Sequence, residues 1–338
     1  MNKYFKNKRV LVTGASGSIG GALVLRLLNM NCKVIRAFSN DENGLYELSE
    51  KVRKFNSNTN LSFQMKKNRI RYIYGDVSDK ERCLTASENI DIVIHAAAMK
   101  HVPFCEYNPF EATKTNVIGT ENMVNASLTN NVSRFLLVST DKVVSPTSCL
   151  GATKLLAERV VMNSENIKGY KKTLFACARF GNVISTRGSI VPYFISQIEN
   201  NQNLTVTDLD MTRYFMTIDN AIDVLIESIN NMNGGEIFIP RKLKLFRVID
   251  LANALKKIYN KKKLSIKIIG KRPGEKIFES LVSDSEIENI KLTNKFYVIR
   301  NSIKNNGIKN NLIRKALKEY KMMSQKEIFD FFKKYAIK

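Results

Sequence analysis

A glycine-rich segment near the start of the chain, Thr13-Gly-Ala-Ser-Gly-Ser-Ile-Gly20, carries the first recognisable chemistry. It lies between an apolar β-branched run and an apolar helical stretch. Backbone N–H groups in such a turn can approach a pyrophosphate closely, and the positive end of the following helix favours the negative charge. Gly14 allows the tight turn, and Gly17 lets the phosphate approach. We therefore expect a dinucleotide site here, with contacts from Gly14, Ser16, Gly17, Ser18 and Ile19.

The end of the second expected strand bears on which dinucleotide is bound. It reads Phe38-Ser39-Asn40-Asp41. An acid at the tip of this strand would bind the ribose 2′-hydroxyl of NAD, whereas a small polar residue with a nearby base would accept the 2′-phosphate of NADP. Because Ser39 and Asn40 precede Asp41, both cofactors remain open. Asp76, after the next strand, is expected to accept a hydrogen bond from the adenine amine.

An acid and a lysine stand side by side at Asp141-Lys142, directly after the expected strand Phe135–Ser139. A neighbouring acid and base, each tuned by the other's charge, can move protons in one active site. The other interpretation is a strand-end turn at the surface with an incidental salt bridge. Which interpretation holds depends on the elements and motifs around the pair.

Short apolar strands alternate with helical stretches through the first half of the chain. The expected strands are Arg9–Thr13, Lys33–Phe38, Tyr72–Tyr74, Ile92–His95 and Phe135–Ser139, and the expected helices are Ile19–Met30, Lys80–Ser87, Pro109–Asn130 and Ala152–Asn163. This alternation predicts a parallel sheet covered on both faces by helices, the doubly wound Rossmann type of α/β fold. Such folds bind their ligands at the carboxyl ends of the strands.

The rhythm loosens after about Asn182, where glycine, proline and polar clusters become frequent. We expect residues 1–184 to form the dinucleotide domain, with a returning segment near 214–240. Residues 185–338 are expected to form mainly a smaller substrate-binding lobe and C-terminal helices. Two amphipathic helices are expected at the end, one near Asn311–Tyr320 and one that starts at the capping box Ser324-Gln-Lys-Glu327.

The composition argues against several classes of protein. Five scattered cysteines and only two histidines argue against a disulfide framework and against a metal site. The formal charge is +23, from 54 Lys and Arg against 31 Asp and Glu. These residues are spread along the chain without a nucleic-acid-binding motif, so solvated lysines are favoured over a nucleic-acid partner, although the positive field would attract an anionic substrate. Without a long apolar run or a signal-peptide core, we expect a cytoplasmic protein and no membrane partner.

Four segments together resemble the nucleotide-sugar 4,6-dehydratases, a family of extended short-chain dehydrogenases/reductases that serves bacterial capsule, O-antigen and flagellin glycosylation. Its members act mostly on UDP-N-acetylglucosamine. The segments are His95–Pro103 with Glu106–Asn116, Ser139–Lys142, Arg179–Val183 with Arg187–Pro192, and Arg272–Lys276. The short glycine spacing, Gly-x-x-Gly-x-x-Gly, is also similar to that of the extended subgroup. The resemblance covers roughly residues 8 to 285.

The resemblance implies a redox-neutral reaction, in which a tightly bound and recycled NAD or NADP accepts hydride from sugar C4 and returns it to C6. Between these steps a base removes the C5 proton and the C6 hydroxyl leaves with help from an acid. By the family's pattern Lys142 is the C5 base, Asp141 is the acid, and Thr140 hydrogen-bonds the C4 oxygen. Lys154 is the lysine that binds the nicotinamide ribose. The expected product is a UDP-4-keto-6-deoxy sugar.

One position departs from the short-chain pattern Tyr-x-x-x-Lys. The chain reads Leu150-Gly-Ala-Thr-Lys154, so the tyrosine that takes the proton of the reacting hydroxyl is replaced by a side chain that cannot transfer one. An apolar residue here is similar to the branch of the dehydratase family that has methionine at this position. Thr140, Asp141 or a water is expected to take over the proton transfer, while Lys154 still binds the cofactor.

The resemblance also implies further binding residues. Arginine forks match diphosphate oxygens with paired hydrogen bonds, which favours Arg213 and Arg272 as substrate ligands beside Asn182. Asn116 is grouped with the cofactor site as the helix asparagine that short-chain enzymes keep as scaffold. The remaining expected cofactor residues are Val77, Ala96, Ala97, Ala98 and Lys100, and the remaining expected substrate residues are Lys100, His101, Arg187, Ser189 and Glu275.

Other functions remain compatible with the sequence. One is a nucleotide-sugar 4-epimerase or a dehydratase of a GDP-sugar, although a pure 4-epimerase has no need for the pair Asp141-Lys142. Another is a catalytically silent NAD(P)-binding regulator, which Leu150 would suit. By family analogy we also expect a homo-oligomer.

Overall fold

A nine-stranded sheet lies at the centre of the computed structural model, which describes residues 4–57, 69–184, 186–300, 307–318, 320 and 322–336. The order of the strands is β13-β14-β10-β6-β5-β4-β1-β2-β3. They are β1 (Arg9–Thr13), β2 (Val34–Ser39), β3 (Ile70–Tyr74), β4 (Ile92–His95), β5 (Arg134–Thr140), β6 (Leu174–Phe180), β10 (Glu236–Pro240), β13 (Ile290–Leu292) and β14 (Phe296–Ile299). From β3 to β10 all neighbours pair in parallel, and β14 and β13 add two antiparallel pairs at the edge. The expected parallel sheet is confirmed.

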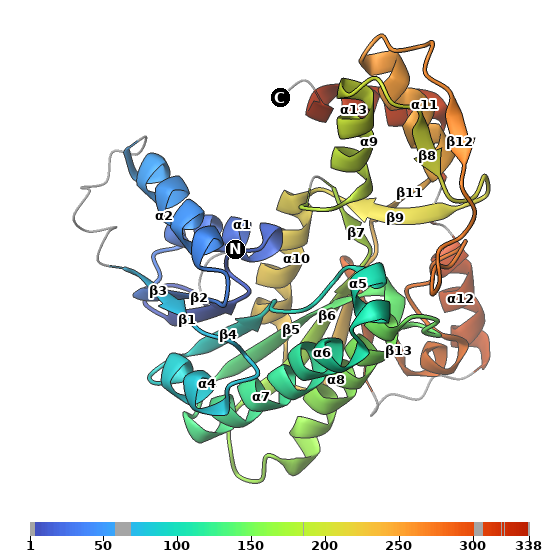
Figure 1. Cartoon of the computed structure of the whole chain (residues 1–338). Helices are drawn as coiled ribbons and strands as arrows, with labels where there is room; N and C mark the ends of the chain where they lie inside the picture. The colour runs from blue at the N-terminus through green and yellow to red at the C-terminus, as the bar shows by residue number, and fades with distance from the viewer. Residues whose placement is uncertain are drawn as a thin grey trace.

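Helices cover both faces of this sheet (Figure 1), and its central strands β4, β5 and β6 are accordingly almost wholly buried. One face carries α1 (Ser18–Leu28), α2 (Glu42–Ser57) and α10 (Ile218–Asn231), and the other carries α4 (Lys80–Ser87), α7 (Gly119–Thr129) and α8 (Cys149–Ile167). The helical stretch expected near Pro109–Asn130 is confirmed, because α6 (Pro109–Thr113), a π-helical turn at Lys114–Ile118 and α7 follow one another without a break. That turn gives Asn116 its position beside the site.

The register of the strands aligns the ends that carry the functional residues. Thr13 pairs with Phe38 on β2 and with His95 on β4, so the segments that follow these three strands leave the sheet at the same level. His95 pairs in turn with Leu137, and β5 continues from there to Thr140. Thr140 and the residues after it therefore project beyond the row formed by the glycine turn and the segment after β4.

A second, smaller core lies beyond the carboxyl edge of the sheet (Figure 1). Its strands are β7 (Asn182–Val183), β9 (Thr212–Met216) and β11 (Lys244–Arg247) in one small sheet, and β8 (Leu204–Val206) with β12 (Ile266–Ile268) in another. Its helices are α9 (Ile190–Glu199), α11 (Val248–Ile258) and α13 (Gln325–Ala336). Between β9 and β11 the chain returns to the large sheet through α10 and β10. The remaining helices are α5 (Val102–Tyr107) and α12 (Gly307–Lys318).

The C-terminal helices begin and end near the expected positions. The reciprocal capping box is confirmed at α13, where Ser324 N–H donates to Glu327 Oε2 and Glu327 N–H donates to Ser324 Oγ. The helix expected near Asn311–Tyr320 is α12, which begins four residues earlier, at Gly307. None of the helices in the described residues is long and apolar enough to cross a membrane.

Candidate active site

A cavity of about 970 Å³ lies between the carboxyl ends of the parallel strands and the smaller core. This is near the upper end of the range for small-molecule sites. Most residues predicted for the site line the cavity: Gly14, Ser16, Gly17, Ser18, Ile19, Val77, Ala96, Ala97, Ala98, Lys100, His101, Thr140, Lys142, Lys154, Asn182, Ser189, Arg213, Arg272 and Glu275. Four predicted residues do not line it: Asp76, Asn116, Asp141 and Arg187.

The glycine turn is built so that only glycine fits at two of its positions. Gly14 has φ +63°, and a Cβ there would lie 2.8 Å from the backbone of Ala97. A Cβ on Gly20 would lie 2.2 Å from the carbonyl oxygen of Gly14. Helix α1 starts directly after the turn, and its N-cap, Gly17, supplies no side-chain hydrogen bond. The first N–H groups of the helix thus lie at the cavity without a side-chain cap, an arrangement suited to an anionic group.

A buried chain of hydrogen bonds fixes the segment after β4. Thr13 Oγ1 accepts hydrogen bonds from the N–H groups of Ala96 and Ala97 and lies 2.8 Å from His95 Nδ1. Thr13 therefore donates to Nδ1, and His95 Nε2–H donates to Thr120 Oγ1, which donates to the Asn116 carbonyl. This order requires a neutral imidazole. Burial, reinforced by the charge of Lys154, lowers the pKa of His95 to about 3. His95 is not among the residues predicted for the site, although it opens the conspicuous run His95-Ala-Ala-Ala.

Asn116 supports the same segment from behind the cavity. Its Oδ1 accepts a hydrogen bond from Met99 N–H at 2.9 Å, and its Nδ2 donates to the Met99 carbonyl at 3.1 Å and to Thr153 Oγ1 at 3.0 Å. Asn116 thereby joins the segment after β4 to helix α8. This is a scaffold position rather than a ligand contact.

The cavity is lined by Ser39 and Asn40 where it reaches the end of β2. Asp76 faces these residues instead of the cavity, because its Oδ2 accepts a hydrogen bond from Asn40 Nδ2 at 2.6 Å. Burial acts to raise the pKa of Asp76, but hydrogen bonds from Ser78 and Asn40 outweigh it and hold the pKa below its usual value. Asp41 caps helix α2 by accepting the Gly44 N–H at 2.8 Å.

The segment that contains Arg187 crosses the glycine turn like a strap, and we use the name Arg187 strap for residues 186–189. Its Arg187 N–H donates to Ser18 Oγ at 3.0 Å, and its Arg187 carbonyl accepts from Lys100 Nζ at 2.6 Å. The Arg187 side chain pairs with Glu47 at 2.5 Å and with Asp41 at 3.7 Å, outside the cavity. Gly188 packs so closely on His101 that a Cβ there would lie 2.3 Å from the ring.

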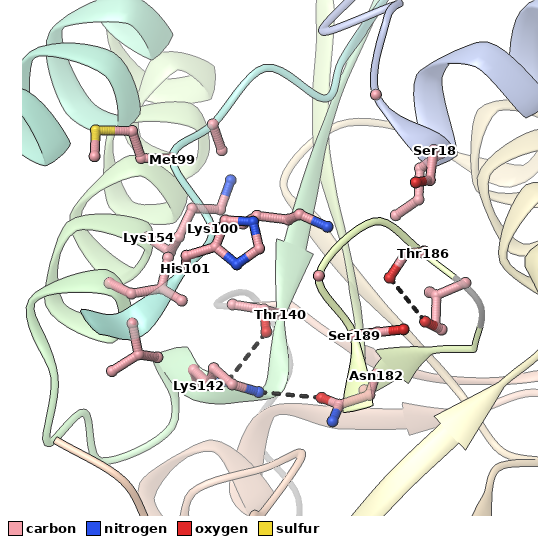
Figure 2. Close-up of a pocket in the computed structure, with 18 of the residues that line it drawn as sticks. Ser18, Met99, Lys100, His101, Thr140, Lys142, Lys154, Asn182, Thr186 and Ser189 are labelled. Carbon is pink, nitrogen blue, oxygen red and sulfur yellow. Dashed lines mark hydrogen bonds between the residues drawn. The ribbon is translucent and has the colours of Figure 1, made fainter. Parts of the chain in front are cut away.

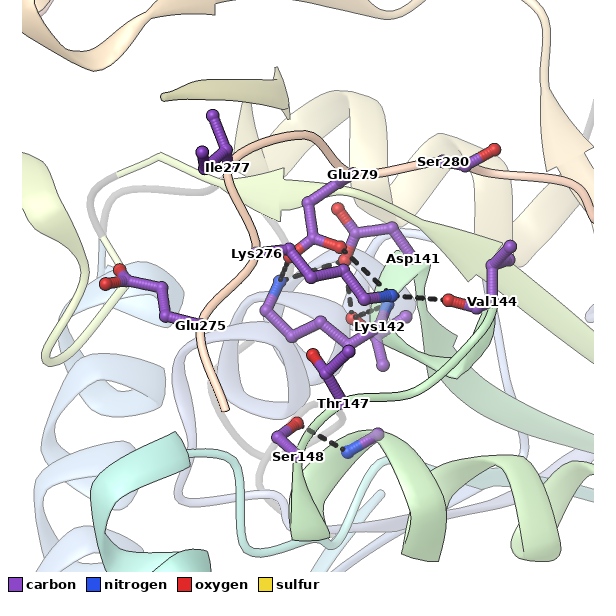
Figure 3. A network of polar contacts seen from close by, with 12 residues as sticks. Asp141, Lys142, Val144, Thr147, Ser148, Glu275, Lys276, Ile277, Glu279 and Ser280 are labelled. Atoms are coloured by element: carbon purple, nitrogen blue, oxygen red, sulfur yellow. Dashed lines mark hydrogen bonds and ion pairs between the residues drawn. The ribbon is translucent and has the colours of Figure 1, made fainter. Parts of the chain in front are cut away.

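Thr140, Asp141 and Lys142 form a compact polar group at the end of β5 (Figures 2 and 3). Asp141 Oδ1 accepts hydrogen bonds from Thr140 Oγ1 and from Lys142 Nζ, both at 2.9 Å. Lys142 Nζ also donates to Asn182 Oδ1 at 3.2 Å. Thr140, Lys142 and Asn182 line the cavity, whereas the Asp141 side chain is 0% exposed. Asp141 therefore reaches the cavity only indirectly, through the hydrogen bonds that it accepts from Thr140 and Lys142.

Helix α8 brings Leu150 and Lys154 to the cavity one turn apart. Lys154 Nζ donates to the Val138 carbonyl at 2.8 Å, which ties the lysine to strand β5. Burial lowers the pKa of Lys154 to about 8, against the opposing charge of Glu158. Ser139 and Ser189 also line the cavity, and each has a buried Oγ without a hydrogen-bond partner in the described part of the chain. Buried hydroxyls of this kind are suited to a ligand.

The segment after β12 closes the cavity from the other side and holds residues that sequence reasoning missed. Arg213 on β9 donates to the carbonyls of Lys276 at 2.9 Å and Ile277 at 3.1 Å, so its guanidinium anchors this segment. Lys276 and Glu279 line the cavity and lie next to Lys142. The run Arg272-Pro-Gly-Glu-Lys276 predicts Arg272 and Glu275 as site residues, but neither the lysine that ends it nor Glu279 three residues later.

The chain is similar to known proteins over most of its length. The family model described as "Polysaccharide biosynthesis protein" matches residues 10–301. The chain belongs to this family. It is 42% identical over 321 residues to an "uncharacterized membrane protein" of Methanocaldococcus jannaschii, with 92% of each chain covered. It is 39% identical to a UDP-N-acetylglucosamine 4,6-dehydratase (inverting) of Campylobacter jejuni, with 89% of this chain and 85% of that protein covered.

Two further proteins are similar to this member of the polysaccharide biosynthesis family. A UDP-glucose 4-epimerase of Rickettsia bellii is 35% identical to it, with 87% of this chain and 83% of that protein covered. The crystal structure of Pen from Bacillus thuringiensis superposes with a TM-score of 0.88 at 35% identity and covers 99% of both chains. The predicted resemblance to the nucleotide-sugar 4,6-dehydratases is confirmed. The similar proteins include both a 4,6-dehydratase and a 4-epimerase.

Proposed function

We propose that the protein is a nucleotide-sugar 4,6-dehydratase that converts UDP-N-acetylglucosamine to a UDP-4-keto-6-deoxy sugar for surface polysaccharide or glycoprotein synthesis. The observation that carries the proposal is that Thr140, Lys142 and Lys154 line the same cavity as the glycine turn. A sugar placed between them would meet a hydroxyl at C4 and an amine at C5. Such placement of reacting groups is the main requirement for proton and hydride transfer.

A nicotinamide dinucleotide fits the residues at the glycine turn. The turn leaves no room for a Cβ at Gly14 or Gly20, and Ser139 Oγ is a buried hydroxyl without a hydrogen-bond partner in the part of the chain that the structure describes. In the proposal the pyrophosphate is held by the turn and the start of α1, and the nicotinamide ribose by Lys154. When bound, the nicotinamide supplies the group that accepts hydride from C4 and returns it to C6.

The form of the dinucleotide is inferred from the residues at the end of β2. The cavity is lined there by Ser39 and Asn40, while the carboxylate of Asp41 is engaged by Gly44 N–H and by Arg187. An acid that binds the ribose 2′-hydroxyl is the mark of NAD, and an arginine nearby accommodates a 2′-phosphate. The proposal therefore includes NADP as the resident form, with Arg187, which lies beside Asp41, as the cation for its 2′-phosphate.

Two protons are handled by the polar group at the end of β5. Leu150 cannot accept the proton of the C4 hydroxyl, but Thr140 Oγ1 is hydrogen-bonded to Asp141 Oδ1 at 2.9 Å. Thr140 would take the C4 proton as it passes its own to Asp141. Asp141, protonated in this way, is the acid for the departing C6 oxygen, acting again through the Thr140 hydroxyl. Lys142 removes the C5 proton.

The competing activity is 4-epimerisation, as in the Rickettsia relative's name. Epimerisation at C4 needs the hydride transfer and the Thr140–Asp141 contact but no base for C5. Lys142, which faces the cavity and is held by Asp141 and Asn182, favours dehydration.

Incubation of the purified protein with UDP-N-acetylglucosamine, followed by mass spectrometry, tests the proposal. We expect a product lighter by one water without any added cofactor. A product of unchanged mass and inverted C4 would establish the epimerase instead. Lys142→Ala should abolish the dehydrated product while the protein retains its dinucleotide, measured by absorbance after denaturation.

A further inference from the structure

The groups around Lys142 stabilise the positively charged form of its side chain, and that form cannot act as a base. Its Nζ lies 2.9 Å from Asp141 Oδ1, 3.2 Å from Asn182 Oδ1 and 3.7 Å from Glu279 Oε1. Three oxygen acceptors, two of them carboxylates, stabilise an ammonium. An ammonium has no lone pair with which to remove a proton. A base at this position needs a group that takes up the extra proton when the sugar is in place.

Glu279 is placed to be that group (Figure 3). Its side chain is 3% exposed, and one oxygen faces Lys142. The other, Oε2, is buried, has no hydrogen bond among the described residues, and lies 3.9 Å from Lys276 Nζ. The backbone that carries it is clamped by Arg213, which donates to the carbonyls of Lys276 and Ile277. The carboxyl is thus rigidly held at the cavity and has an oxygen open for a proton.

The charges that face Glu279 come from three elements. Lys142 and Asp141 face it from the end of β5, Arg213 from β9, and Lys276 from its own segment. Burial raises the pKa of Glu279 and the charge of Asp141 adds to this, outweighing the three cations. Lys276 is partly occupied elsewhere, because its Nζ donates to the Val144 carbonyl at 2.5 Å. Asp141 likewise has an oxygen, Oδ2, without a hydrogen bond among the described residues, but its Oδ1 accepts two, from Thr140 and Lys142, and these stabilise its carboxylate form.

We propose that Glu279 is a positioning residue that takes the ammonium proton of Lys142 and so releases the amine as the C5 base. The inference rests on the proposed function. An N–H bond of Lys142 breaks and an O–H bond forms on Glu279, so the ion pair becomes a neutral amine and a neutral carboxylic acid. The amine then removes the C5 proton and leaves its electron pair in the sugar. When C5 is protonated again, the Glu279 proton returns to Lys142 and the cycle closes.

The pH dependence of C5 proton removal distinguishes this role from a structural one. Two coupled groups that share one proton keep a constant fraction in the amine form between their two macroscopic pKa values. We expect the wild-type rate of C5 exchange with deuterated water to be flat over the pH range between those two values. In Glu279→Gln the amine forms only by loss of the proton to water, so the rate should rise about tenfold per pH unit across that range.

The variants and controls separate the possible outcomes. Glu279→Asp keeps a carboxyl and should restore part of the plateau, whereas Glu288→Gln, the same change at an exposed glutamate, should keep the wild-type rate and profile. A uniformly lower but flat profile for Glu279→Gln would overturn the inference, and so would a profile shifted to lower pH, which marks a mere electrostatic neighbour. If the wild-type protein forms no dehydrated product at all, the proposed function fails instead.

Discussion

Thr140 Oγ1 donates a hydrogen bond to Asp141 Oδ1 at 2.9 Å, which links a hydroxyl in the cavity to a carboxylate that has no exposed surface. This contact offers a route for the C4 proton in a chain that has Leu150 in place of the usual tyrosine. It also explains how a fully buried acid can take part in chemistry. The proton removed at C4 and the proton needed by the leaving C6 oxygen can be the same one.

The first prediction concerns this route. Thr140→Val and Asp141→Asn should each slow C4 oxidation by about 10²-fold or more, the usual contribution of a positioned proton-transfer group. The double variant should be little slower than either single variant, because both changes break one relay. The measurement is the single-turnover rise of reduced-nicotinamide absorbance. Losses that multiply in the double variant would contradict a shared relay.

A second prediction concerns retention of the dinucleotide by the Arg187 strap. Arg187→Ala removes the ion pairs with Glu47 and Asp41 and the cation next to the expected 2′-phosphate. We expect faster release of the bound dinucleotide, with a larger loss of affinity for NADP than for NAD. The matched control is Arg53→Ala, which removes an exposed ion pair with Glu50 on α2, the helix that also carries Glu47. This change should leave the release of the dinucleotide unchanged. Equal losses for the two cofactors would refute the role toward the 2′-phosphate.

The third prediction is a pH dependence of stability from His95. Its folded pKa of about 3 lies below the ordinary value of 6.5, so the unfolded chain binds the extra proton first as the pH falls. The stabilisation is complete above pH 6.5 and should decline by up to about 1.4 kcal/mol per pH unit as the pH falls from there toward 3. Urea unfolding of the wild type and of His95→Asn at pH 7, 6 and 5 measures it. The slope of the unfolding free energy against pH should differ between the two proteins by about the value for one proton. Identical slopes would contradict the neutral imidazole.

A buried ion pair provides the fourth prediction. Arg179 is 1% exposed and binds Glu158 at 2.7 Å and Glu286 at 2.8 Å, which joins β6 to α8 and to the segment after the cavity. Arg179→Ala leaves two buried carboxylates without their partner and should destabilise the protein by about 3–5 kcal/mol. Arg26→Ala breaks exposed pairs with Asp219 and Asp223 and should cost no more than about 1 kcal/mol. Chemical denaturation measures the free energy of unfolding of both variants. Similar decreases would contradict the expectation that the buried ion pair matters more for stability than the exposed pairs.

These cases indicate what the sequence could reveal. The glycine turn, β5 and the pair Asp141-Lys142 are local patterns, because one strand and the turn after it set their geometry. Glu279 could not be assigned in this way, since it meets Lys142 only after the chain has built the smaller core and Arg213 has anchored the segment around it. Arg187 shows the opposite error. A guanidinium suits the diphosphate of a substrate, but Glu47 and Asp41 hold the Arg187 side chain beside the end of β2, away from the residues that line the substrate part of the cavity.

The last prediction tests whether the missing tyrosine can be replaced. Leu150 lines the cavity, is 4% exposed, and lies one turn before Lys154 on α8, so a tyrosine at this position would recreate the pattern Tyr-x-x-x-Lys. Its hydroxyl would provide a proton acceptor for the C4 hydroxyl that does not depend on Asp141. We expect Leu150→Tyr to recover at least tenfold of the C4 oxidation rate lost in Asp141→Asn, within the usual range for a general base. Leu150→Phe is the control, because it adds the ring without the hydroxyl and should recover nothing. Recovery of product formation should remain smaller than recovery of oxidation, because the acid for the C6 oxygen is still absent. Equal recovery by phenylalanine would show that the ring fills space rather than accepts the proton.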